Sequence, residues 1–216
     1  MKTIMLNLCG PLQSYGMKPN GEFVSTNLEP TKSAIAGMIA CAGGIPRKDP
    51  RIKEIEDSIT IKSKIYELPR FLGDLREKKE PPTIITDFQL AQGTEENPIW
   101  QADGKKRETP VFKMKDYIAD TYFRTWVSGD DEKIKQYALW LDDPYWTLYL
   151  GRKSCIPSMP IFIMEENLAI FNDEPTTDFN TMEQPAPSSW HCLRKWAEDR
   201  LKVSEFIKIF GDPDMG

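Results

Sequence analysis

Three short segments combine glycine or proline with hydroxyl and cationic side chains, which are the residue types that bind anions. They are Gly10-Pro-Leu-Gln-Ser-Tyr-Gly16, Glu29-Pro-Thr-Lys-Ser-Ala-Ile-Ala-Gly37 and Tyr149-Leu-Gly-Arg-Lys-Ser-Cys-Ile-Pro157. Each lies where a strand or helix is expected to begin or end, so backbone N–H groups are exposed beside positive charge. Only the fold can bring such distant segments together. If it does, they predict a surface that binds a phosphate backbone.

The second segment supplies the start of a helix. Thr31 and Ser33 flank Lys32, so unpaired N–H groups, the positive end of the helix dipole and a cation converge there. A well-capped surface helix with no ligand explains the same residues equally well. We therefore treat Thr31, Lys32 and Ser33 as candidate anion contacts.

The third segment ends in Gly-Arg-Lys-Ser, which is similar to the end of a phosphate-binding loop. It lacks the upstream glycine of that motif, so it does not predict nucleotide hydrolysis. Arg152 and Lys153 instead suit contacts to phosphates, because arginine offers a bidentate fork and lysine a point charge. Ser154 is a third candidate contact in this segment.

The first segment places three polar side chains between two glycines. Gln13, Ser14 and Tyr15 are candidates for hydrogen bonding to an unpaired base and stacking on it. A tight turn without a ligand is an equally good interpretation of this segment.

No catalytic or metal site is predicted. His191 is the only histidine, and an ordinary structural histidine is the preferred interpretation because no companion motif accompanies it. Asp130 and Asp131 are explained as helix caps. The four cysteines form no CxxC pair, so we expect reduced thiols, no metal and no cofactor.

Charge and hydropathy limit the class of protein. The chain is 40% hydrophobic and 28% charged, a composition typical of a globular protein. It has no apolar run near the roughly 18 residues of a membrane span and begins without a signal peptide. We therefore expect a cytoplasmic protein without a membrane partner. Its net charge of −5 argues against nucleic acid. However, residues 155–193 hold six of the 33 acidic residues and no Lys or Arg, and the rest of the chain has 28 basic and 27 acidic residues.

Hydrophobic periodicity predicts strands at 2–9, 59–66 and 117–127, and helices at 31–42, 51–57 and 130–141. Residues 146–150 and 160–164 are further strand candidates, and 17–29 is expected to be an irregular loop. The resulting order is β–α–β, a long insertion, then β–α–β. This order predicts an α+β, ferredoxin-like (RRM-like, βαββαβ) domain.

The domain is expected to be interrupted and extended. Residues 1–67 form its first half, 68–114 an insertion that we interpret as a protruding hairpin, and 115–170 its second half. The insertion ends in basic residues, among them Lys105, Lys106, Lys113 and Lys115. Residues 171–216 are expected to form an irregular C-terminal extension with no assignable elements.

Five motifs in this order resemble the CasD (Cas-five) family of type I-E CRISPR Cascade complexes. They are Gly10-Pro-Leu-Gln-Ser-Tyr-Gly16, Pro30-Thr-Lys-Ser-Ala-Ile-Ala-Gly37, Thr86-Asp-Phe-Gln-Leu-Ala-Gln-Gly93, Tyr117-Ile-Ala-Asp-Thr-Tyr-Phe123 and Leu148-Tyr-Leu-Gly-Arg-Lys-Ser-Cys155. They extend over about three quarters of the chain and are specific to the family in combination. Residues 173–216 do not match the family's closing strands.

The resemblance implies a non-catalytic RNA-binding subunit that holds the 5′ handle of the CRISPR RNA and caps the backbone filament in antiviral defence. It implies contacts to a CasC-type backbone subunit and a CasA-type large subunit, and to target DNA only through the complex. The insertion matches the family's thumb, and Lys115 stands where the family often has an arginine that contacts the guide. Tyr15 replaces the family's usual tryptophan.

Two other functions remain open. Relatives in type I-C systems cleave the CRISPR precursor, so an endoribonuclease is the principal alternative. An interaction module with no RNA role is the third hypothesis.

Overall fold

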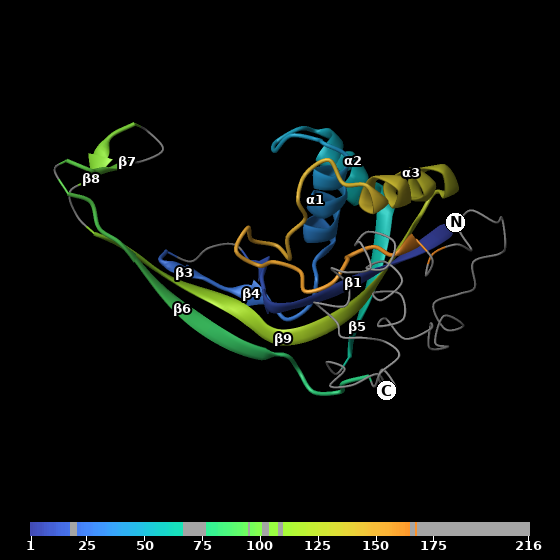
Figure 1. Cartoon of the computed structure of the whole chain (residues 1–216), viewed down its shortest axis with the longest axis horizontal. Coiled ribbons are helices and arrows are strands. Elements are labelled where there is room, and N and C mark those ends of the chain that lie inside the picture. The colour runs from blue at the N-terminus through green and yellow to red at the C-terminus, as the bar shows by residue number, and fades with distance from the viewer. Residues whose placement is uncertain are drawn as a thin grey trace, which may run out of the picture.

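The structure, a computed structural model, describes residues 1–17, 21–66, 77–94, 96–100, 104–107, 110–164 and 167. Among these residues the main sheet is organised around one long strand, β9 (Val111–Gly129), which pairs along both of its edges (Figure 1). The result is a mixed α/β fold in which a single strand runs from the body of the protein into an extended arm.

One edge of β9 pairs with β1 and then with β3. The strand β1 (Lys2–Gln13) is antiparallel to β9, from Lys2 opposite Gly129 to Gln13 opposite Ile118. Farther along the same edge, β3 (Phe23–Val24) pairs in parallel with Met114 and Lys115. Two short strands, β2 (Tyr15–Gly16) and β4 (Thr26–Asn27), pair with each other beside this edge.

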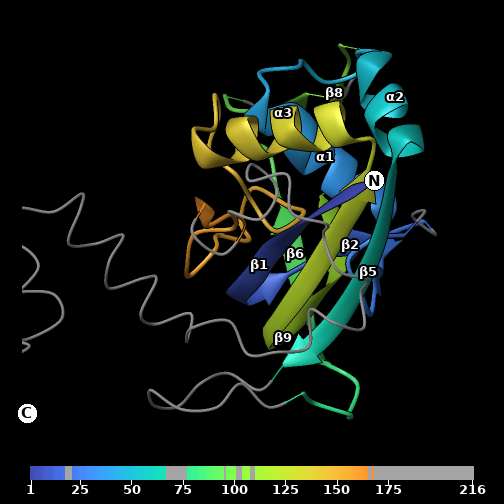
Figure 2. The same cartoon turned by 90° about the vertical axis from the view of Figure 1, so that its right-hand side faces the viewer.

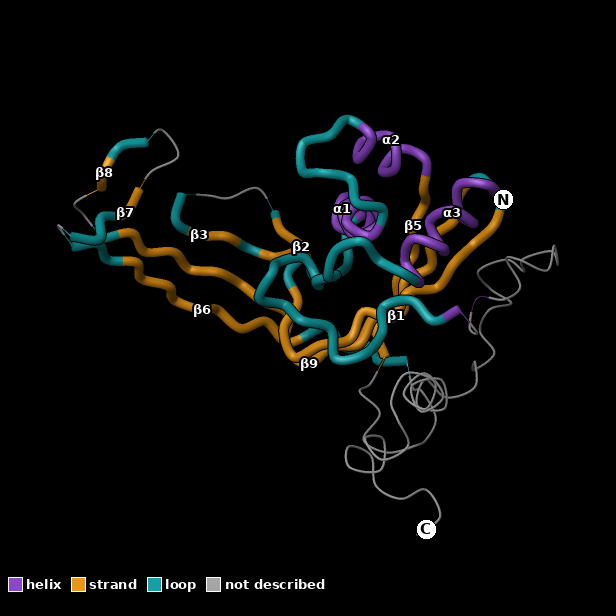
Figure 3. The backbone as a smooth tube through the Cα atoms, turned by 45° about the horizontal axis from the view of Figure 1, so that its top comes forward, coloured by secondary structure: helices purple, strands orange, loops and turns teal. Residues whose placement is uncertain are grey.

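The other edge of β9 pairs with β5 and then with β6. The strand β5 (Ile59–Tyr66) pairs with the C-terminal half of β9, and β6 (Thr83–Ala91) pairs with the N-terminal half, from Thr83 opposite Ala119 to Ala91 opposite Val111. At the end of the arm, β7 (Ile99–Trp100) pairs with β8 (Lys106–Arg107). The arm extends away from the helices, as the tube view shows (Figure 3).

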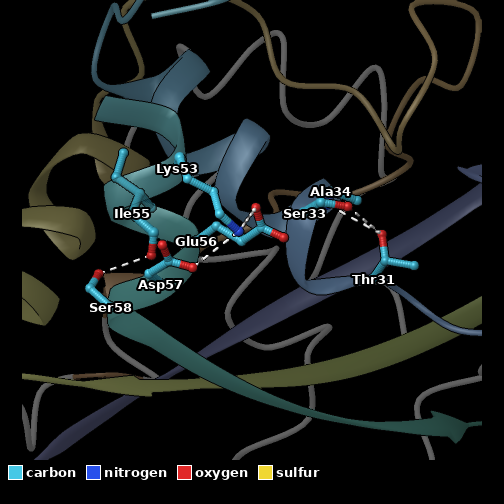
Figure 4. Close-up of polar contacts among 8 residues, drawn as sticks. All are labelled: Thr31, Ser33, Ala34, Lys53, Ile55, Glu56, Asp57 and Ser58. Atoms are coloured by element: carbon cyan, nitrogen blue, oxygen red, sulfur yellow. Dashed lines mark hydrogen bonds and ion pairs between the residues drawn. The ribbon is translucent and has the colours of Figure 1, made fainter. Parts of the chain in front are cut away.

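Three helices lie on one face of the body of the sheet: α1 (Lys32–Ala42), α2 (Arg51–Ser58) and α3 (Asp131–Asp142) (Figure 2). They cover a core formed mainly by the alternate side chains of β1 and β9 that face them and by apolar helix residues, including Ile4, Leu6, Leu8, Phe123, Val127, Ile35, Ile39, Ile134 and Leu141. On α2, Lys53 pairs with Glu56 and Asp57 one turn away (Figure 4).

The predicted helices are confirmed. Asp130 caps α3 by accepting from two backbone N–H groups, and the buried residues of α3 are those predicted from the 3.6-residue period, namely Ile134, Tyr137, Ala138 and Leu141. For α1, Thr31 is the N-cap, as predicted, and Gly43 is the C-cap. The strand predicted at 59–66 has the predicted bounds.

Several strand predictions are wrong. Residues 146–150 and 160–164 form turns and irregular chain, so the last strand expected of a βαββαβ domain is absent from the described residues. Two backbone bonds still hold this chain beside β1: Ser158 N–H to Cys9 O (2.8 Å) and Asn7 N–H to Ile161 O (2.7 Å). Pro157 and Pro160 lack N–H groups, which explains why a continuous ladder does not form.

Three further bounds differ from the predictions. The strand predicted at 117–127 is longer at both ends and runs from Val111 to Gly129. The first strand does not stop at Cys9 but continues through Gly10 to Gln13, and the loop expected at 17–29 contains β3 and β4. None of the described helices is long and apolar enough to span a bilayer. The predicted extension 171–216, together with His191 and Cys192, lies outside the described residues.

Candidate nucleic-acid interface

The first and third segments are joined by backbone contacts. Ser14 N–H donates to Leu150 O at 3.0 Å, directly after β1 ends. Gly10 lies so close to the other segment that a Cβ there would come within 2.8 Å of Ile156 O. Glycine at position 10 therefore allows the third segment to pack on the end of β1.

Gly151 is the tightest point of this contact. Its φ of +93° is disfavoured for residues with a side chain, and a Cβ at this position would lie 1.8 Å from Ser14 O. The turn around it is closed by two bonds, Leu150 N–H to Cys155 O and Cys155 N–H to Arg152 O, each 2.8 Å. The turn thus holds residues 152–154 in a fixed position beside Ser14.

The second segment places the N-terminus of α1 at the same location. The Thr31 hydroxyl accepts from the Ala34 N–H at 3.3 Å and lies 3.3 Å from the Ser33 hydroxyl (Figure 4). Thr31 is therefore a true N-cap, as its residue type predicts. The first turn of α1 has no acidic residue, so the positive end of its dipole is not neutralised there.

All three segments line one pocket with a volume of about 920 Å³. Seven of the ten predicted contact residues border it: Ser14, Thr31, Ser33, Lys115, Arg152, Lys153 and Ser154. The small residues Gly37 and Cys41 of α1 also line it, so a ligand can come close to the helix backbone. The prediction that the segments meet at one site is confirmed.

The pocket is cationic. Arg47, Lys115, Arg152 and Lys153 line it, and none of the described residues that line it is acidic. Among the described residues, no carboxylate forms an ion pair with any of these four side chains. A phosphate group entering the pocket would therefore meet cations whose charge is not already compensated by a side chain.

Arg152 also connects the third segment to the arm. Its guanidinium donates to Asp116 O at 3.3 Å and to Val24 O at 3.2 Å, and it lies 4.5 Å from the centre of the Tyr117 ring. Two of its nitrogens are thus engaged with the backbone of β9 and β3. We assign Arg152 a positioning role in addition to its predicted charge.

Gln13 and Tyr15 are buried, so the prediction that they bind and stack on a base is wrong for their side chains in this structure. Both are 0% exposed, and the Tyr15 hydroxyl donates to Gln13 Oε1 at 2.7 Å. The Tyr15 ring packs edge-on against Phe123, and burial raises the pKa of Tyr15 far above its ordinary value. These two residues instead support the chain that carries Ser14 and Gly16. Ser14 borders the pocket but is only 2% exposed, and its hydroxyl lies 3.4 Å from Asp116 O, to which it donates.

Three residues differ from the predicted set in other ways. Lys32 does not line the pocket, although Thr31 and Ser33 on either side of it do. Arg47 and Gln89 line it and were not predicted. The Gln89 carbonyl oxygen accepts from Lys115 Nζ, which positions that cation. Gln89 lies within the quoted motif Thr86–Gly93 but was not singled out there as a contact, and no local pattern marks Arg47.

The described side chains that line the pocket include groups that bind anions and one thiol, Cys41. Burial raises the pKa of this thiol above the ordinary value, so less of the nucleophilic thiolate is present at neutral pH. Within the described part of the chain, no three of the His, Cys, Asp and Glu residues gather to hold a metal ion. What the arrangement provides is charge, hydroxyl groups and a helix N-terminus.

Comparisons with known proteins identify a family and a relative. The family described as CRISPR-associated protein (Cas_Cas5) matches residues 3–197. The chain is 25% identical over 187 residues to the CRISPR system Cascade subunit CasD of Escherichia coli (strain K12), covering 80% of this chain and 77% of that protein.

Two solved structures superpose on this chain to different extents. A chain of a CRISPR RNA-guided surveillance complex superposes with a TM-score of 0.60 and 25% identity, over 75% of this chain and 62% of that one. A crystal structure of a Cas protein superposes with a TM-score of 0.49 and 19% identity, over 88% of this chain and 69% of that one. Because the family match extends over most of the sequence, the chain belongs to the CRISPR-associated Cas5 family.

Proposed function

We propose that this protein is the RNA-binding subunit of a type I-E CRISPR Cascade complex and that its cationic pocket holds the 5′ handle of the CRISPR RNA. One observation carries the proposal: three segments distant in sequence line a single pocket with four cations, hydroxyl groups and a helix N-terminus. Phosphates of a bent single strand are the ligand that this combination suits.

The walls of the pocket suggest a division of roles. Lys115 and Lys153 neutralise phosphates, Ser33 and Ser154 donate hydrogen bonds, and Arg152 fixes the wall that carries Lys153. On the helix side, no atom lies within 4 Å of the point where a Cβ of residue 37 would be. A base can therefore lie against α1 at Gly37. The pocket is thus proposed to hold an unstacked nucleotide as well as backbone.

The wider assembly is part of the proposal. The chain would have a ferredoxin-like body, with the arm of β6 and the first half of β9 as the family's thumb. It would cap the backbone filament, contacting a CasC-type backbone subunit and a CasA-type large subunit in the cytoplasm. Target DNA would be contacted only through the complex. The names of the CasD relative and of the surveillance complex support this placement.

The pocket is tested by binding of the isolated chain to a fluorescent RNA with the sequence of the repeat-derived handle. Gly37→Phe places a ring in the pocket at a position with free space, and we expect it to weaken binding at least about tenfold. Lys153→Glu should have a similar effect, because a charge-assisted phosphate contact is worth about 1.5–3 kcal/mol. Lys133→Glu, on the exposed surface of α3, is the control and should change the affinity less than twofold. Unchanged affinity in both pocket variants would refute the pocket and favour an interaction module without an RNA role.

The subunit is proposed to be non-catalytic, with a precursor-RNA endoribonuclease as the alternative. Incubating the purified chain with its full repeat RNA in the presence of a chelator distinguishes the two. We expect intact RNA. Site-specific cleavage that is lost on substituting Tyr15, Lys32 or His191 would establish the endoribonuclease.

A further inference from the structure

The strand β6 forms one exposed edge of the arm. All nine of its residues pair with β9 on one side, and no strand among the residues that the structure describes pairs with its other side. Every residue of β6 is exposed, and both figures show β6 at the outer margin of the arm (Figures 1 and 3). Half of the backbone N–H and C=O groups of β6 therefore point away from β9.

This edge lacks the features that usually protect free strands. Proteins limit edge-to-edge pairing with lysine, proline, bulges or very short strands. The nine residues Thr-Ile-Ile-Thr-Asp-Phe-Gln-Leu-Ala contain one charge, Asp87, and no lysine, proline or glycine. Such a segment is a hazard for aggregation if it stays uncovered. Its composition suits a strand that is covered in the assembled state.

One face of this edge is also apolar. Ile84, Phe88 and Leu90 are 38%, 57% and 58% exposed and share a face by the two-residue period of a strand. Phe112 on β9 lies on the same face, and its ring stacks against Phe88 with centroids 6.1 Å apart. Exposed apolar surface of this kind marks a contact with another protein. Lys115 and Gln89, which line the pocket, lie on the opposite face of the arm.

A second copy of this chain does not fit the edge. Full antiparallel overlap of two β6 strands is centred on residue 87, the middle of Thr83–Ala91, and places the two Asp87 carboxylates directly opposite each other. Like charges in that position are destabilising. A strand that carries lysine or arginine opposite Asp87 would instead gain a favourable cross-strand pair.

We propose that β6 is a docking strand to which an extended segment of a neighbouring subunit adds by backbone hydrogen bonds. The segment has apolar side chains against Phe88 and Leu90 and a cation opposite Asp87. This mode of recognition obtains affinity from the main chain and specificity from alternate side chains. The proposal extends beyond RNA binding, because it uses the free edge of β6 and its apolar contacts lie on the face opposite Gln89 and Lys115; only the cation opposite Asp87 lies on the face that lines the pocket.

Hydrogen exchange resolved to single amides tests the docking. It compares the chain bound to its guide RNA alone with the ribonucleoprotein assembled from this chain, the guide RNA and the other Cascade subunits. We expect new protection in the assembly at every second amide of Thr83–Ala91, because the remaining amides already bond to β9. An unchanged pattern, or the same protection with RNA alone, would overturn the proposal.

Substitutions separate this docking from RNA binding. Phe88→Lys and Leu90→Lys place charges on exposed positions, and each should reduce recovery of the chain in the assembly at least about tenfold while its affinity for the handle RNA stays within twofold. Leu139→Lys is the matched control, because Leu139 is 57% exposed on α3. Normal incorporation of both arm variants would refute the docking strand and leave the pocket unaffected. Concentration-dependent dimers of the isolated chain that both substitutions abolish would show that a second copy occupies the edge, and would also refute the proposal.

Discussion

At the scale of single residues, close approach between segments determines the site. Ser14 and Gly151 touch through their backbones, and this contact sets the distance between the end of β1 and the turn that carries Arg152 and Lys153. The glycines of the three segments therefore have different roles. Gly10 and Gly151 allow two backbones to meet, whereas Gly37 leaves open space in the pocket.

These roles give opposite expectations for two alanine substitutions. Gly151→Ala should lower the free energy of unfolding by about 3 kcal/mol, because the position combines a positive φ with a clash at Ser14 O. Gly37→Ala should raise it by about 0.5–1 kcal/mol, because a helix-interior glycine gains from alanine and the space is free. Urea unfolding of both variants checks this. Equal changes would show that Gly151 is not constrained.

Cys41 offers a chemical probe of the pocket. Burial raises its pKa, so less thiolate is present at pH 8 than for an unhindered cysteine, and its alkylation rate should still be rising above pH 9. We expect iodoacetamide to modify Cys41 before Cys9 and Cys155, which are buried. Handle RNA should slow the modification at Cys41, as measured by peptide mapping. Modification that is unaffected by saturating RNA would place the ligand elsewhere.

At the scale of elements, Arg152 connects the third segment to two strands of the arm. Its bonds to the carbonyls of Val24 and Asp116 make the orientation of the arm depend on the turn at 150–155. We therefore expect a ligand bound at Lys153 to affect β3 and β9. Arg152 thus joins the wall of the pocket to the arm.

Breaking this connection should loosen the arm locally. Arg152→Met removes both bonds, and we expect amide exchange in β3 and in residues 112–117 to accelerate about tenfold or more, since each bond contributes about 1 kcal/mol. Lys153→Met is the matched control, because no hydrogen bond of the Lys153 side chain appears within the described structure. Equal exchange in both variants would show that Arg152 does not position the arm.

The sequence predicts elements better than it predicts the surroundings of individual side chains. The caps and periods of α1 and α3 are local signals, and they located both helices and the buried face of α3. The burial of Tyr15 could not be predicted, because it depends on Phe123, more than one hundred residues away. The strands expected at 146–150 and 160–164 fail because tertiary contacts of the intervening turn, with its glycine and prolines, override local propensity.

At the scale of the whole molecule, the distribution of charge matters more than its sum. The chain has a net charge of −5, yet among the residues that the structure describes the pocket is lined by four cations and by no acidic residue. The six acidic residues of 155–193 lie outside the residues that the structure describes. The protein can therefore bind a polyanion at one site without binding nucleic acids over its whole surface.

Salt dependence measures how many of these cations bind phosphate. For a single strand, four neutralised phosphates predict a slope of log affinity against log salt of about −3. Lys153→Gln should make the slope less steep by about 0.7, whereas Lys133→Gln should leave it unchanged. Titrations of handle RNA between low and moderate salt provide the values. A slope near zero would exclude phosphate contacts as the source of affinity.

The most direct test of the pocket is crosslinking of the guide RNA within the assembled complex. Photoreactive 4-thiouridine is placed at single positions along the handle and the spacer, and crosslinked peptides are identified by mass spectrometry. We expect handle positions to crosslink to the parts of the chain that line the pocket, namely 14–16, 31–41, Arg47, Gln89, 115–117 and 148–154, and we expect Gly37→Phe to abolish these crosslinks. Handle crosslinks that map only to other parts of the chain, or to other subunits alone, would contradict it.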